Sequence, residues 1–115
     1  MQDLLFSIAT DKCEAEHDTP PPDRVIEGAP KFTTWNVEEQ PGGIYAGVWE
    51  STPGKWRIAY DEWEYCRILS GVSVIAEDGG GEMRVGPGDS FVIRPGFKGS
   101  WEVIETTRKE YVIRL

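Results

Sequence analysis

Glu64 is the residue of this sequence whose type and position most suggest a functional role. From Glu64 to Ser70 the residue types alternate, so that Glu64, Cys66 and Ile68 share one face of a strand. A carboxylate among apolar neighbours costs free energy unless it is paired, protonated, or bound to a ligand or metal. Glu64 is therefore the candidate catalytic residue, as a general acid or base. The alternative interpretation is a glutamate at a rim, either solvated or paired with an arginine.

The segments around Glu64 predict short strands joined by tight turns. Glycine and proline mark the turns, at Gly71, Asp78–Gly81, Gly86–Asp89 and Pro95–Gly96. No window of ten or more residues carries a helical apolar stripe. About eight strands at short intervals predict an all-β single domain, closed as an antiparallel barrel or jelly roll. The predicted strands are 44–52, 55–60, 62–70, 72–76, 82–85, 90–94, 100–105 and 109–115, after a folded start at 31–37.

Composition excludes several classes of partner. The chain has 115 residues and a formal net charge of −8, with a pI near 4.6. An acidic protein without a basic patch is repelled by nucleic acid and by acidic membrane surfaces, so neither is expected as a partner. No apolar run approaches the roughly 18 residues needed to span a bilayer. The N-terminus lacks the basic region of a secretory signal, so we expect a cytoplasmic location.

Two cysteines, Cys13 and Cys66, could form at most one disulfide. Without a secretory signal, free thiols are the expected state. The chain has no Cys-x-x-Cys motif and no Cys/His cluster, which argues against a structural zinc site.

Residues 1–34 differ from the remainder and predict an N-terminal arm. Asp18–Asp23 contains three consecutive prolines, which favour a turn or polyproline II conformation. The apolar residues Leu4, Leu5, Phe6 and Ile8 could dock as a strand on the same barrel or on a partner subunit. We therefore expect a homodimer, in which this arm or an edge strand pairs across the subunits.

Five short stretches resemble the cupin superfamily, and within it the DUF861 single-domain cupins, which are similar to the cupin domain of (S)-ureidoglycine aminohydrolase. The resemblance runs from about Trp35 to Leu115 and implies a cupin domain over 35–115, with a jelly-roll β-barrel of the RmlC-like type. The stretches that carry it are Trp49–Trp56, Glu64–Gly71, Gly86–Ile93, Gly96–Trp101 and Arg108–Tyr111.

The resemblance also implies a metal position that this chain does not fill. The glutamate of the first cupin motif matches Glu64, but the three histidine positions fall on Ile58, Tyr60 and Gly99. Divalent transition metals favour several imidazole and carboxylate ligands that converge on one ion. We therefore predict no metal site of the usual cupin type. A weak divalent cation at Glu64, with Glu62 and water, is the alternative.

The resemblance implies a ligand pocket in the mouth of the barrel. Aromatic side chains would provide stacking area, and Lys98 would orient a ligand or pair with Glu64. Two functions stay open: a module that binds a small polar metabolite without a metal, or an enzyme acting on a ureido or amide compound with Glu64 as acid/base. The predicted ligand-binding residues are Trp56, Tyr60, Glu64, Cys66, Lys98 and Trp101.

Overall fold

The computed structural model describes residues 3–115, and strands make up most of the chain. Within these residues there is no α-helix, and one short 3-10 helix, η1, precedes the second strand. The elements are β1 (Glu16–Asp18), η1 (Pro22–Arg24), β2 (Val25–Gly28), β3 (Phe32–Gln40), β4 (Ile44–Ser51), β5 (Gly54–Ala59), β6 (Trp63–Glu77), β7 (Glu82–Val85), β8 (Ser90–Ile93) and β9 (Lys98–Arg114).

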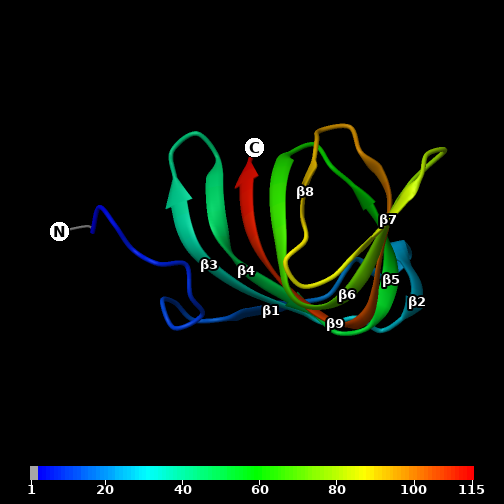
Figure 1. Cartoon of the computed structure of the whole chain (residues 1–115), viewed down its shortest axis with the longest axis horizontal. Helices are drawn as coiled ribbons and strands as arrows, with labels where there is room; N and C mark the ends of the chain where they lie inside the picture. The colour runs from blue at the N-terminus through cyan, green and yellow to red at the C-terminus, as the bar shows by residue number, and fades with distance from the viewer. Residues whose placement is uncertain (1–2) are drawn as a thin grey trace.

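Two long strands, β6 and β9, connect two sheets into a curled barrel (Figure 1). The first half of β6 and the second half of β9 lie in one sheet, in the order β1-β3-β4-β9-β6-β8. The remaining halves lie in the other sheet, in the order β2-β5-β9-β6-β7. All of these pairings are antiparallel, as expected for a jelly roll. The predicted all-β fold is confirmed.

Gly71 bends β6 and does not end it. We predicted separate strands over 62–70 and 72–76, but β6 is continuous from Trp63 to Glu77. The backbone φ of Gly71 is +87°, and a Cβ atom there would lie 2.1 Å from the Thr106 carbonyl oxygen of β9. Pairing with β9 shifts register around this point, which is how a bulge bends a strand without breaking it.

The C-terminal prediction contained the same error. Strands were predicted over 100–105 and 109–115, whereas β9 runs without a break from Lys98 to Arg114. The three glycine-rich turns are confirmed by their backbone hydrogen bonds. These run from Gly80 N to Glu77 O, from Asp89 N to Gly86 O and from Phe97 N to Arg94 O.

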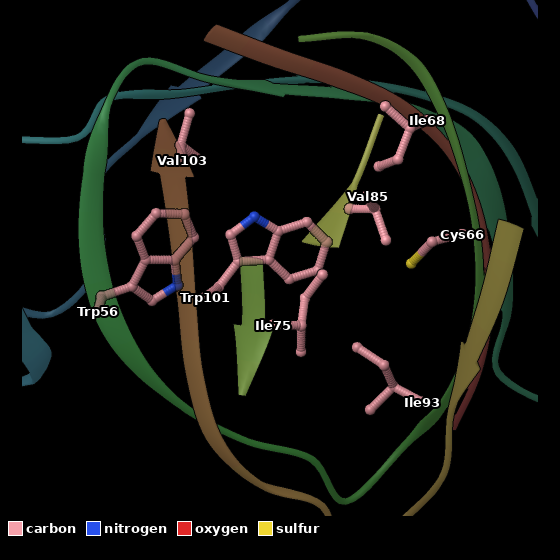
Figure 2. Packing of buried hydrophobic residues seen from close by; sticks show 8 residues of the cluster. All are labelled: Trp56, Cys66, Ile68, Ile75, Val85, Ile93, Trp101 and Val103. Carbon is pink, nitrogen blue, oxygen red and sulfur yellow. The ribbon is translucent and has the colours of Figure 1, made fainter. Parts of the chain in front are cut away.

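The core fills the space between the two sheets. Figure 2 shows Trp56 and Trp101 on one side of it, and Cys66, Ile68 and Ile93 on the other. Cys66 and Ile68 are wholly buried, as their place on the predicted inward face of β6 requires. The other members of the cluster are Ile75, Val85 and Val103.

The N-terminal residues supply edge strands to this chain's own barrel. The strand β1 pairs with β3, and β2 pairs with β5. By contrast, Leu4 and Leu5 are 100% and 91% exposed. Cys13 is exposed and Cys66 buried, and both are free thiols, as predicted. Residues 3–115 include no helix of the length and hydropathy that crossing a membrane would require.

Candidate functional site

A pocket of about 510 Å³ lies on the inner face of the sheet formed by β3, β4, β9 and β6. Near it, β3, β4 and the end of β9 run side by side (Figure 1). Seven of the sixteen lining residues are aromatic. The lining residues are Glu16, Phe32, Thr34, Asn36, Glu39, Tyr45, Trp49, Trp56, Ile58, Tyr60, Glu62, Glu64, Trp101, Lys109, Tyr111 and Ile113.

Strand register explains why residues distant in sequence meet here. Across the sheet, Glu39 is paired with Tyr45, Tyr45 with Ile113, and Ile113 with Glu64. Paired residues on adjacent strands project to the same face, so this row lines one end of the pocket. A second row joins Glu16, Thr34, Trp49 and Lys109 in the same way.

Glu64 lies at the floor of the pocket, with both carboxylate oxygens engaged. It is 3% exposed. The Tyr60 hydroxyl donates to Oε1 at 2.5 Å, and the Lys109 ammonium donates to Oε2 at 3.0 Å. Lys109 is also buried, so the two residues form an ion pair shielded from solvent. Such a pair stabilises the fold only while both charges are present, because either alone would be an uncompensated buried charge.

Two indole rings enclose the Lys109 ammonium. Its Nζ atom lies 4.5 Å from the ring centroid of Trp101 and 4.7 Å from that of Trp49. It also lies 3.5 Å from the Cys66 sulfur. The faces of aromatic rings attract cations, most strongly when the cation is removed from water. The floor of the pocket is therefore a built site for an ammonium group.

Burial and charge together set the protonation of this cluster. Burial raises the pKa of Cys66 to about 12, so Cys66 is a neutral thiol at pH 7. Burial alone would lower the pKa of Lys109, but its interactions with Cys66 and Glu64 outweigh burial and raise it. Because Cys66 is neutral, we attribute this to Glu64. Burial, and then the charge of Glu64, raises the pKa of Tyr60, so Tyr60 stays a donor.

Four of the predicted ligand-binding residues line the pocket: Trp56, Tyr60, Glu64 and Trp101. Cys66 does not line it, because it lies in the core cluster with no exposed surface. Lys98 is exposed and lies beside Asp78, outside the pocket. The predicted ion pair between Glu64 and Lys98 is therefore wrong, and Lys109 takes that place.

Sequence reasoning missed Lys109, although a signal for it was present. Of the seven buried residues of β9, six have odd numbers, among them Trp101 and Lys109, and Ser100 is the one exception. Alternation through a continuous strand places Lys109 on the inward face with Trp101. The prediction of two strands, 100–105 and 109–115, interrupted that alternation and hid it.

Tyr111 and Asn36 form a further polar pair in the pocket wall that was not predicted. The Tyr111 hydroxyl donates to Oδ1 of Asn36 at 2.7 Å. The space for this bond comes from Gly47, since a Cβ atom there would lie 2.9 Å from the hydroxyl and 2.0 Å from the Trp35 carbonyl oxygen. The bond fixes the Tyr111 ring in the wall.

These residues do not fit a transition metal of the usual cupin type. At the three histidine positions, Ile58 is apolar, Tyr60 is bonded to Glu64, and Gly99 has no room for a side chain, since a Cβ would lie 1.9 Å from the Ala76 carbonyl oxygen. Within residues 3–115, no three His, Cys, Asp or Glu side chains gather as a metal site. Glu62 lines the same pocket, but a divalent cation at Glu64 would have to displace Tyr60 or Lys109.

Comparison with solved structures shows the fold at low sequence identity. A DUF861-family protein of unknown function from Pseudomonas syringae pv. tomato is 24% identical with a TM-score of 0.79, over 88% of this chain and 44% of that one. This chain thus spans less than half of that protein. The Clostridium difficile EutQ protein is 17% identical with a TM-score of 0.68, over 95% and 80%.

A DUF861 family protein from Thermotoga maritima is 21% identical with a TM-score of 0.54, over 85% of this chain and 97% of that one. No curated protein matches the sequence. The likeness to these solved structures confirms the predicted cupin jelly roll. Residues 38–111 match the EutQ-like cupin domain family. Because that match covers more than half of the sequence, this chain belongs to the EutQ-like cupin domain family.

Proposed function

We propose that this chain binds a small polar metabolite in the pocket, without the metal set of the usual cupins. The observation that carries the proposal is a pocket of about 510 Å³ with a fixed polar floor of Tyr60, Glu64 and Lys109. Small-molecule sites have volumes of roughly 300–1,000 Å³, mostly apolar walls and a few placed polar groups. The aromatic walls supply contact area, and the polar floor and rim supply orientation.

Binding is favoured over catalysis because the candidate acid/base is already occupied. A general base must reach the proton that it removes, and both oxygens of Glu64 accept hydrogen bonds from this chain. Lys109 is likewise held between Glu64 and two indole rings. A substrate would have to break one of these contacts before proton transfer.

An enzyme acting on a ureido or amide compound is the second candidate. The observation that favours it is the short bond of 2.5 Å between Tyr60 and Glu64, two titratable groups that both line the pocket. In that mechanism Glu64 would serve as acid/base, with Tyr60 as its proton partner. The resemblance to the cupin domain of (S)-ureidoglycine aminohydrolase is what points to the substrate class, and a fold does not determine a reaction.

Thermal unfolding with a panel of metabolites tests the binding proposal. A ligand that binds the folded state raises the melting temperature, by an amount that grows with the ratio of its concentration to its Kd. We expect Tyr45→Ala, which alters the pocket, to weaken the shift. Tyr65→Ala should preserve it, since Tyr65 lies on the opposite face of its strand from Glu64. Ligands that stabilise both variants equally, or a panel without any stabilising member, would contradict the proposal.

Turnover separates the two candidates. Wild type and Glu64→Gln are incubated with ureides and amides, and products are followed by NMR. An enzyme would show turnover that Glu64→Gln abolishes while the variant stays folded. Binding without turnover in wild type supports the non-catalytic function.

A cytoplasmic location stays a prediction.

A further inference from the structure

We propose that the pocket selects a small organic cation, such as an alkylammonium compound, over neutral or anionic molecules of the same shape. This inference rests on the proposed function, because it assumes that the pocket holds a metabolite. Three features support it: the aromatic walls, the ammonium already held at the floor, and the uncompensated carboxylates at the mouth.

The walls of the pocket are largely aromatic. Phe32, Trp49, Trp56 and Trp101 pack with centroid separations of 4.9 to 6.5 Å, and their rings are tilted, edge-on or stacked. Tyr45, Tyr60 and Tyr111 complete the aromatic lining. A cluster of ring faces is the usual protein site for methylated or alkylated ammonium groups, because each face carries negative charge density.

The floor shows that these walls accept a cation. The Lys109 side chain is only 6% exposed, and two indole faces and one carboxylate replace most of the hydration of its ammonium group. The same two kinds of group, rings and carboxylates, continue from the floor to the mouth. Lys109 is the one cationic side chain in the lining, and Glu64 neutralises it. An anionic ligand would therefore find no free positive charge.

The mouth carries three more carboxylates. Glu16, Glu39 and Glu62 line the pocket, and none of them takes part in an ion pair with another described residue. Glu39 stands directly beside Tyr45 in the strand register, and Glu16 stands beside Thr34. At neutral pH these groups give the mouth a negative potential, which attracts cations and repels anions. The net charge of −8 of the whole chain has the same sign.

Three probes that share one shape test the inference by calorimetric titration. They are choline, its neutral carbon analogue 3,3-dimethylbutan-1-ol, and the anion 3,3-dimethylbutanoate. We expect choline to bind about tenfold tighter than the neutral analogue. We also expect choline affinity to fall as salt concentration rises, and binding of the anion to be undetectable.

Two triple variants test whether the preference for choline comes from the carboxylates that line the pocket. The first variant combines Glu16→Gln, Glu39→Gln and Glu62→Gln. It should lose most of the preference for choline over the neutral analogue. The control carries Glu14→Gln, Glu27→Gln and Glu105→Gln, which change net charge equally at exposed positions outside the pocket lining. The control should keep the preference within about twofold.

Each other outcome overturns the inference in a distinct way. Equal binding of choline and the neutral analogue leaves the proposed function intact and removes the cation preference. Preferential binding of the anion, or equal loss in both triple variants, also overturns it. If none of the probes binds, the cation class is wrong, and the metabolite panel decides separately whether the pocket binds a ligand.

Discussion

At the scale of the residue, the buried Lys109–Glu64 pair determines what the pocket can do. Its two side chains are 6% and 4% exposed, and their charged atoms are 3.0 Å apart. The Lys109 ammonium places a positive charge beside Glu64. A transition metal would need imidazole ligands that Ile58, Tyr60 and Gly99 cannot supply. Both carboxylate oxygens of Glu64 accept hydrogen bonds from this chain, from Tyr60 and from Lys109.

Breaking the pair from either side should destabilise the fold strongly. We predict that Lys109→Met and Glu64→Met each lower the free energy of unfolding by roughly 3–5 kcal/mol, because each leaves one buried charge without its partner. The double variant should lose much less than the sum. Urea unfolding of all four proteins measures this coupling. The pair Arg108–Glu50, whose side chains are 36% and 29% exposed, is the control, and Glu50→Gln should cost less than about 1 kcal/mol. If the loss in the double variant equals the sum of the two single losses, the two side chains are not coupled and the prediction is wrong.

Cys66 should make the fold sensitive to alkaline pH. Its pKa is raised from the ordinary 9.0 to about 12 in the folded state, so the unfolded chain loses this proton first as pH rises. Stability is therefore complete below pH 9 and falls as pH approaches 12. Between pH 8 and 10 the loss from Cys66 should be about 1 kcal/mol. Tyr60, Tyr111 and Lys109 have raised pKa values too, and add most of their loss above about pH 10.

Urea unfolding between pH 8 and 10 measures that loss. Cys66→Ala should flatten the pH dependence in this interval, whereas Cys13→Ala, at the exposed cysteine, should leave it unchanged. The quantity compared is the change in unfolding free energy with pH. The cavity that Cys66→Ala leaves in the core lowers stability equally at every pH and so does not change this slope. Equal slopes in wild type and Cys66→Ala would show that the buried thiol is not responsible.

At the scale of the element, the sequence predicted the strands well and their continuity poorly. Alternation from Glu64 to Ser70 placed Glu64 and Cys66 on the inward face, and the glycine turns were found because positive φ angles favour glycine. Gly71 was misread because a glycine in a bulge and a glycine in a turn carry the same local signal. The difference lies in Thr106 of β9, a contact that no local pattern reveals.

The prediction that β9 is two separate strands also led to the wrong lysine, Lys98, in the site. In an unbroken β9, Lys98 and Trp101 differ by an odd number and point to opposite faces, whereas Lys109 and Trp101 share one face. The resemblance suggested Lys98 by motif position, and strand parity would have corrected it. The pocket residues from β1, β3 and β4 depend on long-range register, which the sequence does not contain.

Replacement of Gly71 should cost far more than replacement of a turn glycine. Gly71→Ala combines a positive φ with a clash of 2.1 Å against the β9 backbone, and we predict a loss of about 3 kcal/mol or more. Gly79 is the matched control, because its φ is +71° and no atom lies within 4 Å of its Cβ position. Gly79→Ala should cost about 1–2 kcal/mol. Similar losses in chemical denaturation of both variants would contradict the role given to Gly71.

At the scale of the whole molecule, the N-terminal segment before β1 presents apolar residues that this chain does not cover. Leu4 and Leu5 are almost fully exposed, and Phe6 is 37% exposed. Contiguous exposed apolar residues are typical of interaction segments. The expected homodimer would use this segment or an edge strand.

Removal of that apolar surface tests the dimer. We predict that light scattering coupled to size exclusion gives twice the chain mass for wild type and a lower mass for Leu4→Ser with Leu5→Ser. A control that replaces Leu115, which is 71% exposed at the other terminus, should behave as wild type. A monomeric wild type would contradict the prediction.

Chemical-shift mapping by two-dimensional NMR shows directly whether a ligand binds in the pocket above Lys109 and Glu64. The protein is titrated with whichever metabolite stabilises it most. We predict that the largest amide shifts fall on residues lining the pocket, among them Asn36, Tyr45, Glu64, Lys109 and Tyr111. Shifts confined to the outer face of the sheet, around Tyr65 and Val92, would contradict it.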